Sequence, residues 1–401
     1  MAGRVAPYID NTGLVFAYDQ ANIVRSYLGE PTTNFVPGTY GYTTYAYVSG
    51  PVDTTVFNEK NQLTTVKRYT ITEAINTARA RILPSGLTTG VAYTFSFKWK
   101  YNGTTTASPS VGIDASKGNP EGGANNNSFT SATTNTVSIG NGWYLSTYTF
   151  VFSSVPTGQC MLTFGIVTGS TAGFVGETFD IYEAQFEIKN HRTQYSNGTR
   201  SATQGLKDLT AKNTIDISTV SFDSNAQMTF DGSDDHILTS ENIALNGSQT
   251  FEVITTISGG PQSPAGIISN HDYANTSNFG LNHISGNRIG ISIGYTDNSR
   301  EYDSKYTTYT ATVGTPFHLV MTFDQSSNTV KLYINGVLDS TFVLTKTVKF
   351  TSRPVVLGRW DYQYNYYYFN GKIPVAKAYN RALSAADVTQ NFNAVRGRYG
   401  I

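Results

Sequence analysis

Polar and apolar side chains alternate along most of this chain, which is the pattern of β-strands with one buried face. Residues 330–336, VKLYING, place three aliphatic side chains on one face and Lys331 and Tyr333 on the other. The segment ends in an Asn-Gly pair, a strong signal for a two-residue hairpin turn. Residues 318–324, HLVMTFD, alternate in the same way, and the polar QSSNT joins the two segments. We therefore predict an antiparallel meander here.

Short strands recur along the rest of the sequence. Glycine, asparagine, serine and proline separate them, as expected for tight connections. Five further segments have the strand pattern: 13–19, 93–99, 143–152, 160–167 and 288–295. Many short strands of this kind predict an all-β protein built from β-sandwiches.

One segment near the C-terminus, ALSAADVTQNFNAVRGRYG, has helical periodicity instead. Ser384 and Asp387 have the spacing of a capping box, and Leu383 and Val388 have that of a hydrophobic staple. Gly397 suits a helix C-terminus. We predict one short C-terminal helix that packs on the last sandwich.

The chain divides by composition into two sandwiches, one inserted near the start of the other. Residues 35–198 are rich in aromatic residues and threonine, whereas residues 199–401 contain the meander and the helix. The strand at 13–19 is too apolar for a free tail, and a jelly roll must pair its edge strands. We therefore expect residues 1–34 to complete the C-terminal sandwich. Inserting a domain costs little when its two ends lie close together.

Five segments of the C-terminal half resemble, in order, the laminin-G-like, concanavalin-A-like jelly-roll family. They are FDGSDDHI, QTFEVIT, the meander FHLVMTFDQSSNTVKLYINGVLDSTF, the glycine-closed VVLGRW, and FNGKIPVAKAYNRALSAADVTQNFNA. The resemblance covers residues 218–394 and implies a jelly-roll sandwich. One departure is Pro374, which follows Lys372 and Ile373 where the family often has an acidic residue.

The two ends of the chain resemble a narrower group, the jelly-roll proteins of tailed-phage virions. The opening GLVFAYDQANIVRSYLG and the ending QNFNAVRGRYGI carry this resemblance, and a further matching segment begins at Asp208. Between them, residues 91–200 resemble a carbohydrate-binding-module-like sandwich of phage structural proteins, most clearly in the stretch from Ala184 to Ser201, AQFEIKNHRTQYSNGTRS. These resemblances imply a virion protein.

Composition narrows the functional classes. The chain has 28 basic and 28 acidic residues among 401, so no overall charge would attract nucleic acid or acidic lipid. No run of 18 apolar residues predicts a membrane span, and the start lacks the apolar core of a secretory signal. The single cysteine, Cys160, excludes an intrachain disulfide. We expect synthesis in the host cytoplasm and a location in the virion, with neither nucleic acid nor membrane as a partner.

An acidic cluster lies in the segment TFDGSDDHILT, at Asp231, Asp234 and Asp235, with His236 directly after it. Its glycine stands in the wrong place for an EF-hand loop, and no glutamate closes the motif. The main interpretation is a turn in which Gly232 supplies an unusual dihedral angle and the aspartates bond local amides. The alternative is a Ca²⁺ site, for which Asp272 in a second polar loop is a weaker candidate. No other cofactor is expected.

Residues 359–371, RWDYQYNYYYFNG, contain seven aromatic residues. If the stretch were extended, alternation would send every second ring to one side: Trp360, Tyr362, Tyr364, Tyr366 and Tyr368. Aromatic rings stack on sugars and anchor protein interfaces. We interpret the first four of these rings as a contact surface for a glycan or another subunit. The alternative is a loop folded over its own core.

The best candidate for glycosidase chemistry does not fit. Residues 177–187, ETFDIYEAQFE, hold four carboxylates, but their spacing differs from the E-x-D-x-x-E strand of jelly-roll glucanases. Strict alternation would place Asp180 opposite Glu177, Glu183 and Glu187. We therefore expect a protein that is not an enzyme.

These observations favour a structural or decoration protein of a tailed-phage virion, on the capsid or in a tail appendage. It would act by docking onto other virion proteins and onto copies of itself. The alternative is an adhesin that attaches the virion to glycans of the host surface.

Overall fold

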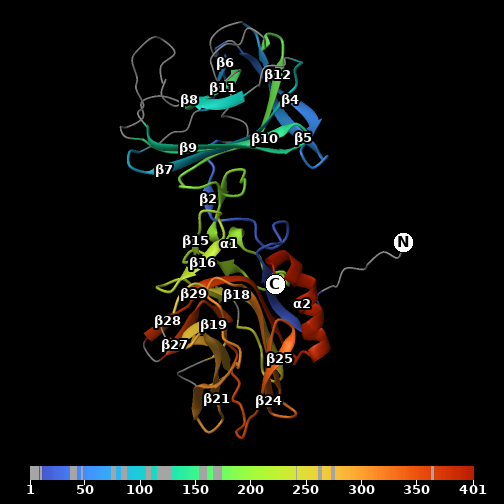
Figure 1. Ribbon diagram of the computed structural model, residues 1–401, viewed down its shortest axis with the longest axis vertical. Helices are drawn as coiled ribbons and strands as arrows, with labels where there is room; N and C mark the ends of the chain where they lie inside the picture. The colour runs from blue at the N-terminus through green and yellow to red at the C-terminus, as the bar shows by residue number, and fades with distance from the viewer. Residues whose placement is uncertain are drawn as a thin grey trace, which may run out of the picture. The chain divides into compact units, whose positions relative to one another are not determined.

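Strand β1 (Leu14–Asp19) pairs antiparallel with β29 (Asn370–Tyr379), so strands from the two ends of the chain lie side by side (Figure 1). Phe16 and Tyr18 of β1 are fully buried, and the Tyr18 hydroxyl donates to the carbonyl of Ile373 at 2.7 Å. The Asp208 carboxylate accepts a hydrogen bond from the backbone N–H of Ala17 at 3.0 Å. The opening strand is thus an integral member of the sheet.

The computed structural model describes residues 9, 11–36, 43–46, 48–73, 78–82, 88–104, 110–114, 129–152, 160–165, 174–240, 242–260, 264–271, 276–362 and 365–401. The chain forms two compact units. Unit 1 comprises Met1–Pro31, Ser201–Asp223 and Gln227–Ile401, and unit 2 comprises Thr32–Arg200 and Ser224–Ala226. The predicted all-β class, with one sandwich inserted near the start of the other, is confirmed.

Unit 1 is a sandwich of two large antiparallel sheets. In the part of the chain that is described, the first sheet has the order β15-β16-β29-β18-β23-β24-β25, with β1 added on β29. Its further members are β15 (Ser221–Phe222), β16 (Met228–Asp231), β18 (Gln249–Ile257), β23 (Phe317–Asp324), β24 (Thr329–Ile334) and β25 (Val337–Val343). The second has the order β14-β17-β26-β19-β20-β21-β22. These are β14 (Ile215–Asp216), β17 (Ile237–Thr239), β26 (Val356–Leu357), β19 (Ala265–Ser269), β20 (Phe279–Ile284), β21 (Arg288–Gly294) and β22 (Arg300–Tyr306).

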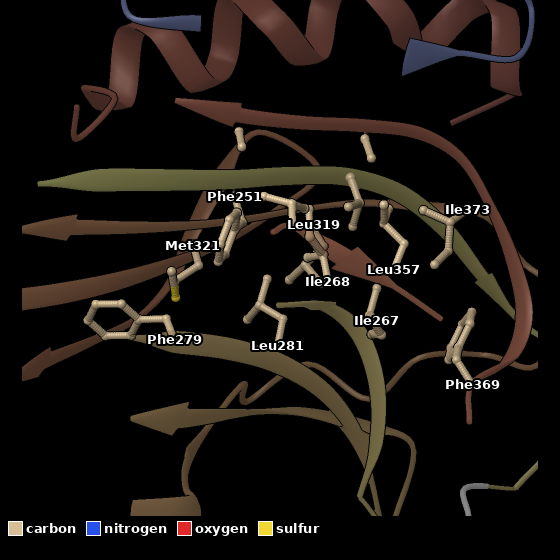
Figure 2. Packing of buried hydrophobic residues seen from close by; sticks show 14 of the residues in the cluster. Phe251, Ile267, Ile268, Phe279, Leu281, Leu319, Met321, Leu357, Phe369 and Ile373 are labelled. Atoms are coloured by element: carbon tan, nitrogen blue, oxygen red, sulfur yellow. The ribbon is translucent and has the colours of Figure 1, made fainter. Parts of the chain in front are cut away.

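The core of unit 1 fills the space between these two sheets. Figure 2 shows Phe251, Leu319 and Met321 of the first sheet facing Phe279 and Leu281 of the second. The predicted meander is confirmed, because β23 and β24 pair in register and turn alternate side chains into this core. Dense packing of aliphatic and aromatic groups explains why so few charged residues are needed to hold the sandwich together.

Helix α2 (Ala385–Tyr399) lies on the outer face of the first sheet, as predicted. Ser384 caps it, and the capping box with Asp387 is present. The predicted stop at Gly397 is wrong, since the helix continues to Tyr399 and Gly400 adopts the left-handed conformation that ends it. A one-turn helix, α1 (Ala202–Gly205), was not predicted.

Because α2 covers the outer face, side chains that alternation sends outward are also buried. Val320 and Tyr333, on β23 and β24, pack with Leu383 and Val388 beneath the helix. Only the uncovered positions of this face, such as Lys331, reach solvent.

Unit 2 is a second sandwich, with sheets β4-β5-β12-β7-β10-β9 and β3-β6-β11-β8 among its described residues. The first comprises β4 (Val48–Phe57), β5 (Leu63–Ile71), β12 (Thr178–Glu187), β7 (Ala92–Tyr101), β10 (Trp143–Phe152) and β9 (Phe129–Gly140). The second comprises β3 (Thr43–Ala46), β6 (Ala78–Ile82), β11 (Cys160–Gly165) and β8 (Ser110–Asp114). A short pair, β2 (Thr32–Thr33) with β13 (Thr199–Arg200), joins the two ends of the unit. Its core is strongly aromatic, with Tyr93, Phe95, Phe150, Phe152 and Phe186 in mutual ring contact.

A β-bulge in β12 changes which carboxylates share a face. Phe179 and Ile181 point into the core before the bulge, and Ala184 and Phe186 do so after it. The register shift lies around Glu183, which has a positive φ of 48°. The strict alternation assumed for this strand is therefore wrong, because the extra residue brings positions 180 and 187 to the same face.

These carboxylates are engaged in local contacts. Arg68 donates two hydrogen bonds to Asp180, at 2.6 and 2.7 Å. Glu187 is fully buried and accepts from Thr32 at 2.7 Å and from the N–H of Thr193 at 2.9 Å. Glu177 accepts from the N–H of Thr104 at 2.9 Å. The exit motif that carries the resemblance of this unit thus builds part of its hydrogen-bond network.

No helix among the described residues is long and apolar enough to cross a membrane.

Candidate ligand-contact surface

The aromatic stretch 359–371 folds back on itself rather than running extended. Strands β27 (Arg359–Tyr362) and β28 (Asn365–Tyr368) form a hairpin that lies against β19 (Figure 1). Directly opposite residues of a hairpin share a face, and Trp360 pairs with Tyr367 while Asp361 pairs with Tyr366. Because the chain reverses, even positions of β27 share a face with odd positions of β28. The expectation of five rings on one side is therefore wrong.

The inner face of this hairpin belongs to the body of unit 1. The Trp360 ring is only 2% exposed and lies 5.3 Å from the ring of Tyr302 and 5.8 Å from that of Tyr367. Gly266 of β19 permits the close approach, since a Cβ atom there would lie 2.3 Å from the carbonyl carbon of Arg359. Trp360 anchors the hairpin to the sheet and offers no ring to a ligand.

The outer face presents aromatic and charged groups to solvent. Tyr366 is 53% exposed, and the Arg359 guanidinium lies 4.4 Å from its ring centre. Arg359 also pairs with Asp361, with an Nε to Oδ1 distance of 2.8 Å. The rings of Tyr366 and Tyr368 lie edge to face, 6.2 Å apart. Arg359 is thus held between a carboxylate and a ring, which fixes the orientation of both.

The acidic cluster forms the turn between β16 and β17, and so connects the two sheets. Oδ2 of Asp235 accepts from the N–H of Asp231 at 2.7 Å, and its Oδ1 accepts from the N–H of Ser221 at 3.0 Å. Asp231 in turn accepts from the N–H of Ser233 at 2.7 Å. Gly232 has a φ of 85°. These contacts are those of the predicted turn, in which aspartates replace missing backbone partners.

The three carboxylates also lie within reach of one another, with one ligand atom from each inside 4.8 Å. Asp231 and Asp234 are exposed, whereas Asp235 is buried. Burial raises the pKa of Asp235, and the nearby charge of Asp231 raises it further. Two exposed carboxylates could contribute oxygens to a hard cation such as Ca²⁺, which prefers six to eight oxygen ligands.

The turn and the hairpin meet at one surface. The His236 ring lies 6.2 Å from that of Tyr368. Burial raises the pKa of Tyr368, and the carboxylates of Asp234 and Asp361 add to this effect while Arg359 opposes it. The structure therefore joins two sequence candidates that are more than a hundred positions apart. We call this region the hairpin surface: Asp231, Asp234, His236, Arg359, Asp361, Tyr366 and Tyr368.

Some predicted residues fall elsewhere. Asp272 and Tyr364 lie outside the described residues, and the side chain of Tyr362 is not described. Arg359 and Tyr368 were not among the candidate contact residues, although the alternation of a hairpin would have indicated both. His236 was noted beside the acidic cluster, but no local signal in the sequence indicated that its ring would lie near the aromatic hairpin.

The comparison with protein families agrees with the sandwich fold of unit 1. Residues 231–389 match a family described as the concanavalin A-like lectin/glucanases superfamily, and all of them lie in unit 1. No curated protein matches the chain significantly.

Three solved structures illustrate the likeness. The botulinum neurotoxin serotype G binding domain is 17% identical with a TM-score of 0.38, over 47% of this chain and 48% of that one. The chain thus spans about half the length of that toxin domain. A Trypanosoma rangeli sialidase in complex with 2,3-difluoro-KDN is 12% identical with a TM-score of 0.38, over 47% of this chain and 30% of that one. The CBM40 of a Ruminococcus gnavus sialidase, bound to α2,3-sialyllactose, is 17% identical with a TM-score of 0.32, over 38% of this chain and 91% of that one.

Proposed function

We propose that this protein is a non-enzymatic adhesin of a tailed-phage particle and that its hairpin surface binds a saccharide of the host surface. The observation that carries the proposal is the exposed ring of Tyr366 beside Tyr368, close to the carboxylates of Asp234 and Asp361. The virion setting rests on the sequence resemblance at the two ends of the chain. The family match to lectins and glucanases agrees with a saccharide ligand.

Sugars need two kinds of contact, and the hairpin surface offers both. Exposed tyrosine rings can cover the apolar C–H face of a pyranose. Carboxylates accept hydrogen bonds from sugar hydroxyls, and charge-assisted bonds of this kind are stronger than neutral ones. The Arg359 guanidinium is paired with Asp361 and lies over the Tyr366 ring, so it holds that ring in place. The carboxylate of Asp234 is exposed and can accept hydrogen bonds from a ligand.

The test is binding of the full chain to an array of bacterial surface glycans, with Tyr366→Ala compared with Tyr306→Ala. Tyr306 on β22 is a matched control, because it is 39% exposed and Arg288 lies over its ring at 4.1 Å. We expect Tyr366→Ala to weaken glycan binding by up to about tenfold, and Tyr306→Ala to leave it unchanged. Failure to bind any glycan, or equal losses in both variants, would overturn the saccharide proposal.

Docking onto another virion protein is the second candidate for the same surface. The stacked pair of Arg359 and Tyr366 favours it, since arginine and tyrosine dominate the binding energy of protein interfaces. Imaging of the intact particle separates the two candidates. A hairpin surface covered by a neighbouring protein would indicate docking, whereas one that faces away from the particle would indicate an adhesin.

A further inference from the structure

A groove of about 460 Å³ lies on unit 1 over strand β1, and no residue of the hairpin surface lines it. Ala17 of β1 pairs with Lys377 of β29, whose ammonium group contacts Glu252 beneath α2. The groove therefore opens on the outer face of the first sheet, beside the helix. Its volume falls within the range of about 300–1,000 Å³ that is typical of ligand sites.

The groove and the aromatic hairpin belong to opposite faces of the sandwich (Figure 1). The hairpin lies against β19 of the second sheet, where Gly266 permits the close approach of the backbone at Arg359. The groove instead lies over β1 and β29 of the first sheet. A partner bound in the groove would therefore leave the exposed rings of the hairpin uncovered.

Three aliphatic side chains give the groove its apolar surface, namely Ile9, Leu14 and Leu209. Each of them is half-buried, so part of each side chain remains in contact with solvent. Ile9 and Leu14 also pack on the clusters beneath α2, which places them on the face where the groove opens. Covering this surface with an apolar side chain of a ligand would be favourable, at about 25 cal/mol per Å².

Two cations at the rim of the groove have no counter-ion. Arg25 and Lys212 are both exposed, and neither forms an ion pair with any residue that the structure describes. The other charged groups of the lining are engaged, because Asp19 pairs with Arg398 at 2.6 Å and Lys377 with the carboxylate beneath α2. An anionic group would therefore meet two available cations without displacing an existing partner.

Two asparagines add hydrogen-bonding groups to the lining. Oδ1 of Asn22 accepts from the N–H of Arg25 at 3.0 Å, and its amino group has no partner among the described residues. Asn11 is exposed, and its side-chain amide can both donate and accept. Such amides can pair with the backbone C=O and N–H groups of an extended peptide.

These three kinds of group together select the ligand. Inorganic phosphate would satisfy the two cations but would leave the aliphatic surface uncovered. A nucleic acid would need a longer basic track, since its affinity depends on the number of phosphates that are neutralised. A peptide that carries carboxylates beside apolar side chains uses the cations, the aliphatic surface and the amides at once.

We infer that this groove binds an acidic peptide segment of a partner protein, with its carboxylates on Arg25 and Lys212 and its apolar side chains on Leu14 and Leu209. That the partner is another virion protein rests on the proposed function, whereas the chemistry of the groove does not. The groove would then attach the protein to its assembly, while the hairpin on the opposite face stays free for a saccharide of the host.

The experiment is ligand-observed saturation-transfer NMR on the full chain with the peptide acetyl-Leu-Glu-Leu-Glu-Leu-amide. Its control is acetyl-Leu-Gln-Leu-Gln-Leu-amide, which has nearly the same shape but no charge. We expect the glutamate peptide to bind about tenfold more tightly, because each exposed charge pair adds up to severalfold to the affinity. Added salt should reduce this difference, since it screens exposed charges.

The double variant Arg25→Glu/Lys212→Glu should reverse the preference. The glutamate peptide should bind at least about tenfold more weakly, and acetyl-Leu-Lys-Leu-Lys-Leu-amide should bind in its place. Lys331→Glu is the matched control, because Lys331 is exposed on the same face of the sheet and outside the groove. It should leave both affinities unchanged. Leu209→Ala should weaken the glutamate and glutamine peptides alike, because it removes apolar surface and no charge.

Three results would overturn the inference: equal binding of the glutamate and glutamine peptides, binding of neither, or binding that the double variant leaves intact. A single-stranded DNA oligonucleotide that binds more tightly than the glutamate peptide, and is lost in the double variant, would overturn it as well. The proposed function is tested separately. Glycan binding that depends on Tyr366 should persist in the double variant, and peptide binding should persist in Tyr366→Ala.

Discussion

The carboxylate of Glu252 on β18 lies 2.6 Å from the ammonium group of Lys377 on β29, and the two side chains are only 1% and 3% exposed. His318 lies 3.1 Å from the same carboxylate, and the Asn391 side chain of α2 donates to it at 2.7 Å. The C-terminal helix is therefore docked on the sheet through a buried carboxylate that four elements share. Buried charges are tolerated only when they are paired and hydrogen-bonded in this way.

Replacing Lys377 with methionine should destabilise unit 1 strongly. The change leaves Glu252 buried without its cation, and breaking a buried pair in this manner costs about 3–5 kcal/mol. Chemical denaturation of the full chain, followed through the unfolding transition of unit 1, measures the loss. Lys331→Met on the same sheet is the control: Lys331 is exposed and should change the free energy of unfolding by less than about 0.5 kcal/mol. Equal effects of the two substitutions would contradict the importance of the pair.

The same carboxylate predicts how unit 1 responds to acid. Burial alone would raise the pKa of Glu252, but Lys377 and His318 outweigh it and hold the pKa at about 2. A pKa that is lowered on folding adds stability above the unfolded value, near 4.5, and that stability is lost as pH falls toward about 2. At neutral pH the lowered pKa of Glu252 contributes about 3 kcal/mol to the free energy of unfolding.

Unfolding measured at several pH values between 5 and 2, in the unsubstituted protein and in the Glu252→Gln/Lys377→Met double variant, isolates this effect. The double variant has no charge at either position, so its stability should fall less steeply over this range. If the free energy of unfolding fell equally steeply with decreasing pH in both proteins, other carboxylates would account for the acid sensitivity.

Local patterns in the sequence predicted most of the fold, because strand alternation and helix capping depend on residues that are close together in the chain. Alternation identified the strands of the meander, and Ser384 with Asp387 identified the start of α2. The buried pair could not be predicted, since Glu252 and Lys377 lie 125 positions apart and meet only through sheet pairing. The candidate site was predicted only in part, because it also depends on contacts between residues that are far apart in the sequence. The sequence indicated the aromatic stretch, but only the hairpin reversal decides that Trp360 is buried while Tyr366 is exposed.

The position at which α2 ends predicts opposite changes in stability for two glycine substitutions. Gly397 lies inside the helix, and a Cβ atom there would meet nothing within 4 Å, so Gly397→Ala should stabilise the protein by about 0.5–1 kcal/mol. Gly400 has a φ of 69°, which alanine adopts poorly, so Gly400→Ala should destabilise by a similar amount. Melting temperatures of the two variants compare them directly. A helix that ended at Gly397 would reverse the two signs.

The acidic turn predicts how the protein responds to a chelator. Both oxygens of Asp235 already accept backbone N–H groups of the turn, so the cluster has a structural task that needs no cation. We expect the melting temperature to be the same in EDTA and in millimolar Ca²⁺. Asp235→Ala should still lower the free energy of unfolding by about 2–3 kcal/mol, because it leaves the N–H groups of Asp231 and Ser221 without acceptors. Asp234→Ala, at an exposed carboxylate, should cost less than about 0.5 kcal/mol.

A bound ion would give a different pattern, because a ligand that binds only the folded state raises the melting temperature in proportion to its occupancy. In that case Ca²⁺ would stabilise the protein, EDTA would remove the gain, and Asp234→Ala would abolish the response.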